Sequence, residues 1–215
     1  MGTQDPWAVT PPNRDMALQQ YRARADRYDS ELAPFEPLRR EAIECLRLRP
    51  GEVVLDVGCG TGLSFAPLLD RLGPRGRIVG IEQCPEMMAQ ARRRVQAGHW
   101  RVSLVQAPAE EAQWRGRADA ALFHFTHDIL RHPAALDNIL GHLRPGARVA
   151  ATGLQWAQPW AWPVNCFVLG AALYSVSSLD GLDQPWSRLA TRLDHVEVRP
   201  AWMGGIFIAT GTWPG

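Results

Sequence analysis

The sequence contains no lysine, and all 23 of its basic residues are arginine. This absence excludes chemistry that requires a lysine, such as a Schiff base or the phosphate-binding lysine of a P-loop. The chain also lacks a charge excess of either sign, since 22 acidic residues leave a formal net charge of +1 at pH 7. Proteins that bind nucleic acid through bulk electrostatics carry a basic excess, so the composition predicts that nucleic acid is not a partner.

Cysteine is scarce and scattered. The 215 residues include four cysteines, with no C-x-x-C pair and no companion histidine at zinc-finger spacing: Cys45, Cys59, Cys84 and Cys166. This usage is typical of a reduced protein, so we expect a cytoplasmic location. It also predicts that the protein has no metal site.

Long uninterrupted apolar runs are missing as well. The longest apolar stretch, Pro159–Val176, is broken by Pro163, Asn165 and Gly170 and is too short for a transmembrane span, which leaves at most a peripheral membrane contact. Residues 1–13 are polar and proline-rich without a signal-peptide pattern, so we expect a disordered leader there. The remaining residues, 14–215, are expected to form a single domain.

The most informative stretch is EVVLDVGCGTG, Glu52 to Gly62. Val53–Val57 is typical of a buried strand, and Asp56 lies near its carboxyl end. The glycines that follow are spaced G-x-G-x-G, whereas a dinucleotide site would have G-x-G-x-x-G. A buried carboxylate at such a turn repels a pyrophosphate but attracts an ammonium group. The turn therefore predicts a site for a ligand with an amino-acid moiety.

Strands and helices then alternate along the chain. A helix is expected over Leu63–Leu72, and the pattern of a βα unit repeats after it. Alternation of this kind predicts an α/β protein with a Rossmann-like, doubly wound sheet that binds its ligand at the carboxyl ends of the strands. The further strands expected in this sheet are Arg77–Ile81, Val102–Val105, Ala118–Phe125 and Ala147–Leu154.

The glycine turn with Asp56 resembles motif I of the class I S-adenosylmethionine-dependent methyltransferases. LRPGARV, Leu143–Val149, resembles the family's approach to its fifth strand. The last two predicted strands, His195–Arg199 and Gly205–Thr210, are similar to the antiparallel sixth and seventh strands of that family. The resemblance covers about Tyr21–Gly211 and implies a seven-stranded sheet with an antiparallel terminal strand. It also implies S-adenosyl-L-methionine as cofactor.

The resemblance assigns roles to further residues. Glu82 follows the second strand and corresponds to the acidic residue that binds the ribose hydroxyls in the family. Tyr28 lies in a "YD" segment whose aromatic side chain covers the cofactor in many members, although docking of its helix is an equal alternative. Met87 is placed against the adenine or, equally, in the core. Where many members have an Asp that binds adenine, this chain has Pro108, so the Ala109 N–H is expected to hold the adenine, with Glu110 or Gln106 as substitutes.

The predicted cofactor site is therefore a set of residues from five segments of the chain. Its members are Tyr28, Asp56, Gly58, Cys59, Gly60, Gly62, Glu82, Gln83, Met87, Ala109, Glu110 and His124.

Two histidines follow the fourth strand, where an acceptor has to approach the methyl group. His127 and His124 are the candidates for contact with the substrate or for general-base duty, because imidazole accepts a proton near neutral pH. Packing or helix capping is the alternative for both, and a metal pair is the least favoured one, because neither carboxylates nor further histidines cluster locally enough to complete a metal shell. Trp156–Trp162, a stretch rich in tryptophan and proline, is expected to line or cover the substrate pocket, with plain packing as the alternative.

The acceptor is the least determined feature. The layout of the chain resembles the quinone C-methyltransferases and the bacterial aminophospholipid N-methyltransferases. We expect N-methylation of a small amine or an amine-bearing lipid head group. The alternatives are a C- or O-methyltransferase of a quinone or another aromatic small molecule, a non-methylating enzyme that uses the same cofactor, and a non-catalytic cofactor-binding protein. Nothing in the sequence indicates the oligomeric state.

Overall fold

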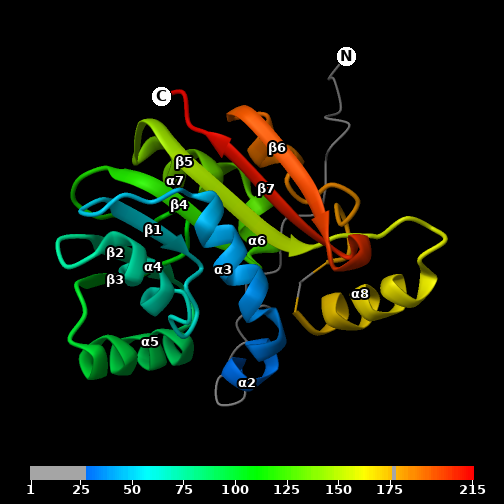
Figure 1. Cartoon of the computed structure of the whole chain (residues 1–215), viewed down its shortest axis with the longest axis horizontal. Helices are drawn as coiled ribbons and strands as arrows, with labels where there is room; N and C mark the ends of the chain where they lie inside the picture. Colours follow the sequence, from blue (N-terminus) through cyan, green and yellow to red (C-terminus); the bar gives the residue numbers. More distant parts are fainter. Residues whose placement is uncertain (1–27, 176–177) are drawn as a thin grey trace.

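The structure is a computed structural model that describes residues 28–175 and 178–215. Its centre is a twisted sheet with helices on both faces (Figure 1). The strands lie in the order β3-β2-β1-β4-β5-β7-β6, and β7 runs antiparallel to β5 and β6 while the other neighbours are parallel. The strands are β1 (Val53–Val57), β2 (Arg77–Glu82), β3 (Val102–Gln106), β4 (Ala118–His124), β5 (Leu143–Leu154), β6 (Asp194–Ala201) and β7 (Ile206–Thr212).

The helices are short, and most follow a strand directly. The described helices are α2 (Tyr28–Leu32), η1 (Ala33–Phe35), α3 (Glu36–Cys45), α4 (Phe65–Leu72), α5 (Pro85–Gly98), α6 (His127–Leu130), α7 (Pro133–Gly141), α8 (Trp162–Ser175), α9 (Ser187–Ala190) and η2 (Trp202–Gly204). The doubly wound, seven-stranded fold with its antiparallel terminal strands, predicted as a single domain, is confirmed.

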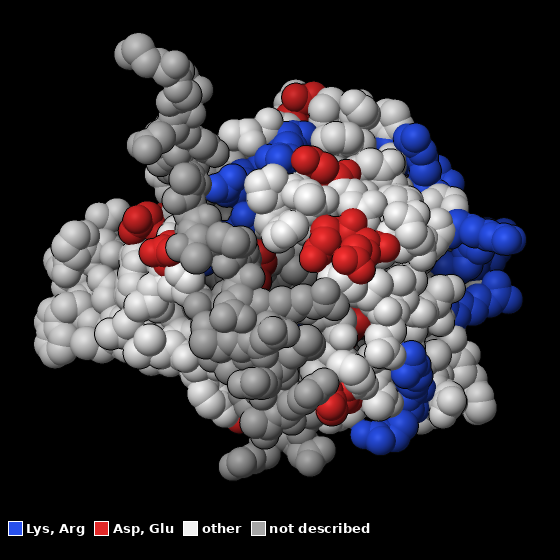
Figure 2. All heavy atoms as spheres, turned by 180° about the vertical axis from the view of Figure 1, so that it is seen from behind, with Lys and Arg blue, Asp and Glu red and all other residues white. Residues whose placement is uncertain are grey.

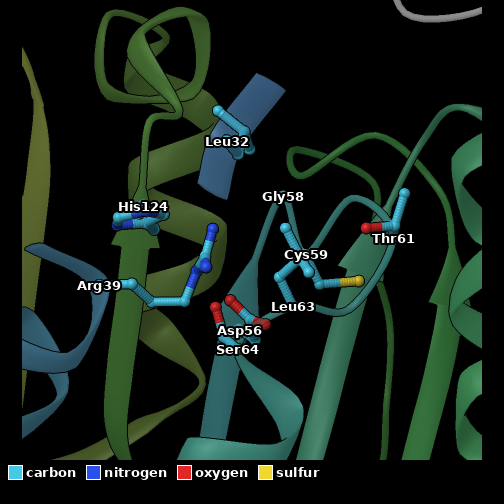
Figure 3. Close-up of a pocket in the computed structure, with 9 residues that line it drawn as sticks. All are labelled: Leu32, Arg39, Asp56, Gly58, Cys59, Thr61, Leu63, Ser64 and His124. Atoms are coloured by element: carbon cyan, nitrogen blue, oxygen red, sulfur yellow. The ribbon is translucent and has the colours of Figure 1, made fainter. Parts of the chain in front are cut away.

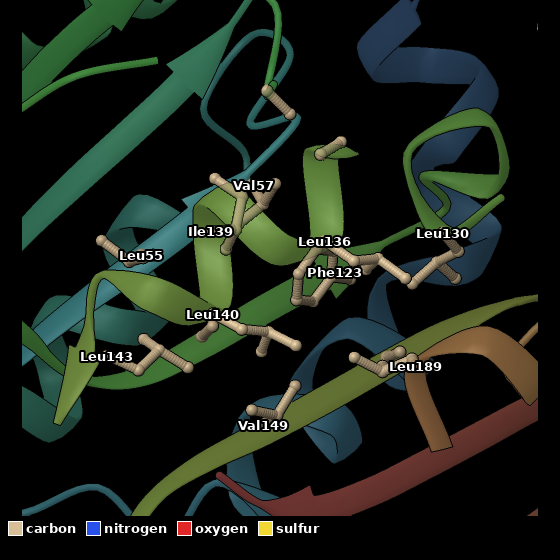
Figure 4. Packing of buried hydrophobic residues seen from close by; sticks show 14 of the residues in the cluster. Leu55, Val57, Phe123, Leu130, Leu136, Ile139, Leu140, Leu143, Val149 and Leu189 are labelled. Carbon is tan, nitrogen blue, oxygen red and sulfur yellow. The ribbon is translucent and has the colours of Figure 1, made fainter. Parts of the chain in front are cut away.

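Burial explains the apolar strand sequences, because each face of the sheet is covered. Helices α3, α4 and α5 cover one face, where Ile43, Phe65 and Met88 pack against the sheet. Helices α6, α7 and α9 cover the other, and Phe123 packs there with Leu136 (Figure 4). Buried apolar area of this extent is the main stabilising contribution to the fold.

The strand order places a crevice beside β1. The chain winds from β1 outward to β3 and then returns to form β4 on the opposite side of β1. Asp56 lies opposite Gly80 of β2 and Leu122 of β4. In doubly wound sheets, ligands bind outside the carboxyl ends of the strands where the order reverses, which here is the gap between β1 and β4.

Several predicted boundaries differ from those observed. The fifth strand begins at Leu143, earlier than the expected Ala147, because Leu143 pairs with Ala118 of β4 and because Trp213 accepts from Gly146 and donates to Ala147. Within the apolar stretch that was too short and too broken for a transmembrane span, residues Trp162–Ser175 form helix α8. The predicted leader at residues 1–13 lies outside the described residues, and its boundary stays a prediction.

The described helices include none that is both long and apolar enough to cross a membrane.

Candidate functional site

The glycine turn after β1 requires its glycines. Gly58, Gly60 and Gly62 have φ values of 68°, 56° and 84°, a region that favours glycine. A Cβ on Gly58 would lie 2.6 Å from Cγ2 of Thr126, so the turn passes directly against the second residue after the end of β4. The turn is closed by a hydrogen bond from Gly62 N–H to the Cys59 carbonyl, 2.9 Å long.

A pocket opens between this turn, the end of β4 and the N-terminal helices (Figure 3). Three of the predicted cofactor residues from the turn and β1 line it, and so does His124 at the end of β4. The complete lining is Leu32, Arg39, Asp56, Gly58, Cys59, Thr61, Leu63, Ser64 and His124. Of these, Leu32, Arg39, Thr61, Leu63 and Ser64 were not predicted from the sequence.

Two opposite charges meet in the pocket. Asp56 is 1% exposed, and Arg39 of α3, which is 2% exposed, points toward it (Figure 3). Burial raises the pKa of Asp56 to about 7, a shift that the nearby Arg39 guanidinium opposes and that Glu82 reinforces. Asp56 Oδ2 and Arg39 Nε are both buried without a hydrogen-bond partner in the described part of the chain. Each charged group can therefore accept or donate one bond to a ligand.

Arg39 is also held by Glu36, with which it forms an ion pair one helical turn earlier in α3. Glu36 is about one-third exposed, so the pair bridges the buried pocket and the surface. Arg39 lies three and four residues before Ala42 and Ile43, both of which face the sheet, so the helical spacing places it on the same side of α3.

Glu82 braces the glycine turn. Its Oε2 accepts from Gly60 N–H at 3.1 Å and its Oε1 accepts from Cys84 N–H at 2.6 Å. Burial raises the pKa of the Glu82 carboxyl, while these backbone donors oppose the shift. The carboxylate thus lies beside the glycine turn, as predicted, and each oxygen keeps lone-pair capacity for a further donor.

His124 and His127 have different surroundings. His124 lines the pocket, and neither of its ring nitrogens has a hydrogen-bond partner among the described residues. Burial, with Arg39 nearby, lowers its pKa well below the usual value, so the ring is neutral. His127 is absent from the described pocket lining. Its Nε2 lies 2.8 Å from the Leu154 carbonyl, and its ring packs against Gly153, an arrangement that fixes α6 to the end of β5.

Helix α2 is attached to the glycine turn by a carboxylate. Asp29 accepts from the Thr61 hydroxyl at 2.6 Å and from Arg94 of α5 at 2.5 Å. These two contacts of Asp29 hold α2 in place, so that Leu32 at the end of this helix lines the pocket. Tyr28 is the first residue of α2, and its side chain lies outside the described residues.

The predicted adenine side lies farther along the strand ends. Met87 and Ala109 are buried, and Gln83 and Glu110 are half-buried. Asn138 of α7 fixes this loop, because its Nδ2 donates to the carbonyls of Ala109 at 2.8 Å and Ala112 at 3.0 Å. Asn138 was missed from the sequence, since a lone asparagine in an amphipathic helix is typical of a solvated face.

The tryptophan-rich stretch does not cover the pocket. Trp160 and Trp162 are 80% and 68% exposed, and neither is among the lining residues that the structure describes. Trp156 is half-buried and packs against the cluster that contains Leu154 and Leu182. The stretch leads into α8 and does not line this pocket, and the expectation that Trp156–Trp162 lines or covers the substrate pocket stays a prediction.

The described residues contain no group of three or more His, Cys, Asp or Glu side chains that could hold a metal ion.

Comparison with known proteins agrees with this geometry. Residues 54–146 match the family described as a methyltransferase domain. The matched segment runs from β1 to the start of β5 and so includes the glycine turn, Glu82 and His124. Over residues 54–146 the match confirms the predicted resemblance to the class I S-adenosylmethionine-dependent methyltransferases, together with the predicted cofactor class.

The similar curated proteins have names that refer to different substrates or to none. An uncharacterized 37.1 kDa protein in transposon TN4556 of Streptomyces fradiae is 29% identical over 72% of this chain and 50% of its own length. The ribosomal RNA small subunit methyltransferase H of Rubrobacter xylanophilus is 42% identical over 39% of this chain and 28% of that protein. The nocamycin O-methyltransferase of Saccharothrix syringae is 32% identical over 55% of this chain and 44% of its own length. The chain spans half or less of the length of these relatives.

Solved structures share the fold. The N-methyltransferase NodS from Bradyrhizobium japonicum WM9, in complex with S-adenosyl-L-homocysteine, superposes with a TM-score of 0.66 and 17% identity, covering 93% of this chain and 99% of that one. The [4+2]-cyclase SpnF superposes with a TM-score of 0.61 and 19% identity, covering 83% and 80%. At these identities the likeness shows a common fold.

Proposed function

We propose that this chain, which carries a class I S-adenosylmethionine-dependent methyltransferase domain, methylates a small-molecule acceptor at the carboxyl ends of β1 and β4. The observation that carries the proposal is the pairing of Asp56 and Arg39 in one buried pocket, each with an unpartnered polar atom. The amino-acid part of the cofactor has an ammonium and a carboxylate group. The Asp56 carboxylate matches the ammonium and the Arg39 guanidinium matches the carboxylate, since charge pairs are strong where water is excluded.

The residues present fit this cofactor in two further respects. Gly58 lets the turn approach a ligand where a Cβ would meet Thr126. Glu82 has carboxylate oxygens, already oriented by Gly60 and Cys84, that can accept from two ribose hydroxyls. In this arrangement Asp56, Arg39 and Glu82 bind and orient the cofactor.

The bound cofactor supplies a methyl group that is already activated by the positive charge of its sulfonium. The protein then has to hold an acceptor atom in line with that methyl group, which can contribute several of the roughly 7–11 kcal/mol available from positioning. Thr126 and His124 lie where the acceptor enters, beside Gly58. The Thr126 hydroxyl is also buried without a partner in the part of the chain that the structure describes.

His124 is the residue that we assign to the acceptor. A neutral imidazole has one nitrogen that accepts and one that donates a hydrogen bond. The neutral His124 ring can therefore accept a hydrogen bond from an acceptor N–H or O–H and orient that group toward the methyl group. His127 does not share this role, because its Nε2 is engaged by Leu154; it positions α6.

We assign an amine as the acceptor, either a small amine or an amine-bearing head group. The ring of His124 adjoins Phe125, with centroids 4.9 Å apart, and Phe125 adjoins Phe35 at 5.1 Å. Aromatic rings of this kind stabilise an alkylamine through its methyl groups and, after transfer, through its charge. The second candidate is O- or C-methylation of an aromatic acceptor, which the same rings and the nocamycin O-methyltransferase relative favour.

A nucleic-acid substrate is the weaker assignment, although one relative is named a ribosomal RNA methyltransferase. The net charge is +1, and the face in Figure 2 shows acidic side chains near its centre with basic ones mainly toward its edges. A duplex or single strand requires a continuous basic surface.

The test has two stages. Calorimetry with S-adenosylmethionine and S-adenosylhomocysteine is expected to show binding of both, and binding of neither would overturn the proposal. A screen of amines, phenols and quinones for S-adenosylhomocysteine release then identifies the acceptor. Release with phenols alone would replace the amine by the second candidate, and incubation with cofactor alone detects a non-methylating reaction by its products.

A further inference from the structure

Helix α8 has the composition of a buried helix but lies largely exposed. Its sequence, WPVNCFVLGAALYS, has no charged side chain, and Val168 and Ala172 are its buried residues. The side chains of Trp162, Leu169 and Leu173 are 68%, 39% and 62% exposed. Apolar helices of about this length are usually core helices. In Figure 1, α8 projects beyond the end of the sheet.

The exposed side chains form a regular stripe. Trp162, Cys166, Leu169 and Leu173 are spaced four, three and four residues apart, and all four are exposed. At 100° per residue they fall within an arc of about 60° on one side of the helix. This is the spacing with which one helix packs against another in a coiled-coil seam. Gly170 borders the stripe, and a Cβ there would meet nothing within 4 Å, so a partner helix can approach closely.

We propose that this stripe is the contact between two copies of the chain, with α8 packed against α8 of the second copy. A two-fold contact places the same surface against itself, so any charge on it would face a like charge. The absence of charge from α8 makes its surface compatible with itself. A helix that lies on a bilayer usually has a charged face rich in Lys or Arg, and α8 has neither residue.

The apolar surface continues from α8 onto η2. The ring of Phe167 lies 5.5 Å from the ring of Trp202, and Met203 beside it is 81% exposed. Phe167 lies about 130° around α8 from the centre of the stripe, so η2 flanks another side of the helix and the contact consists of the helix pair. A contact made of one helix pair is at the small end of specific interfaces, so we expect dissociation in the micromolar range, on the order of 10 μM.

Sedimentation of the full chain between 1 and 200 μM tests the proposal. The wild type is expected to change from monomer to dimer over this range. Leu169→Glu should remain monomeric at 200 μM, while Val198→Glu on β6, a residue of similar exposure, should dimerise as the wild type does. A monomeric wild type at 200 μM overturns the proposal, and so does a dimer that Val198→Glu dissociates and Leu169→Glu does not.

The Cys166 thiol gives a second measurement that needs no substitution. Its rate of alkylation, followed by peptide mass spectrometry, should fall at least fivefold between 1 and 200 μM, while the rate at half-buried Cys45 stays constant. Equal rates at Cys166 at both concentrations contradict the contact. Co-sedimentation with neutral phosphatidylcholine vesicles completes the test: a chain that binds vesicles through α8 and stays monomeric assigns the stripe to a lipid surface and overturns the proposal.

Discussion

The Arg39 guanidinium of α3 points toward the Asp56 carboxylate of β1 across a buried pocket, and burial holds the pKa of that carboxyl at about 7 despite this cation. The pair is arranged for a zwitterion, because each member retains one buried polar atom with no partner in the described residues. Substitution of either residue should therefore reduce the affinity for the cofactor more than it reduces the stability of the fold.

Asp56→Asn is expected to reduce affinity for S-adenosylhomocysteine by about 100-fold, since a charge-assisted hydrogen bond in a buried site contributes about 2–3 kcal/mol. Arg39→Met should have an effect of similar size on the same ligand. Calorimetry at pH 7 measures both. Val198→Glu, on the exposed strand β6, is a control that should bind like the wild type; a normal affinity in Asp56→Asn would contradict the role of the pair.

The pKa of Asp56 also predicts a pH dependence of binding. The carboxyl has to be ionised to bind an ammonium group, so affinity should increase by about 15-fold from pH 5.5 to 7.0. The α-amino group of the ligand stays charged across this window, since its ordinary pKa is about 7.7–8.0. Asp56→Asn should lose most of the slope, and a variant with the full wild-type slope would show that another group titrates.

The stability of the ligand-free protein should change with pH in the opposite direction to the affinity, falling as the pH rises. The folded pKa of Asp56 is above its ordinary value of 3.8, so the ligand-free protein loses stability as pH rises from about 4 through 7. Between pH 5 and 7 the loss is about 3 kcal/mol at most. Asp56→Asn lacks this carboxyl, so its melting temperature should exceed that of the wild type by more at pH 8 than at pH 5. A constant difference would contradict the assignment.

Gly58 provides a steric test. Gly58→Ala places a Cβ 2.6 Å from Cγ2 of Thr126 in a backbone with φ of 68°. We therefore expect the free energy of unfolding to fall by about 1–3 kcal/mol and the cofactor to bind more weakly. Gly141→Ala is the matched control, because its Cβ would meet nothing within 4 Å at the end of α7. Urea unfolding measures both, and Thr126→Ser in the Gly58→Ala background should recover part of the loss.

The two histidines should separate in function. His124→Ala is expected to bind cofactor normally and to lose methyl transfer by about 10²-fold or more. His127→Ala should instead lower the free energy of unfolding by about 1–3 kcal/mol, because the Leu154 carbonyl loses its buried partner. Single-turnover transfer and urea unfolding distinguish the two. Loss of transfer in a stable His127→Ala, with His124→Ala fully active, would reverse the assignment.

Local patterns were enough to predict the glycine turn, Asp56 and Glu82, because a strand end and the turn that follows it are fixed by neighbouring residues. Arg39 could not be assigned in this way, since its role depends on α3 packing against strands that come later in the sequence. The same holds for Asn138, whose partners are Ala109 and Ala112.

Helix α8 was missed for a different reason. Its proline is the second residue, where the missing N–H has no helical acceptor and costs little. Taken as a break, Pro163 made the apolar stretch look irregular, and the direction in which Trp160 and Trp162 point was decided by the tertiary position of α8. The separation of His124 from His127 likewise depends on Phe125, whose φ of 56° turns the chain between them.

Recognition of the amino-acid part of the cofactor by Asp56 and Arg39 is the central feature of the proposed site. The most direct measurement compares, by calorimetry, S-adenosylhomocysteine with 5′-methylthioadenosine, which has the nucleoside but lacks the amino acid. We predict that the wild type binds S-adenosylhomocysteine about 100-fold more tightly and that Asp56→Asn and Arg39→Met each reduce this ratio to near one. Equal affinities of the wild type for the two ligands would contradict the account.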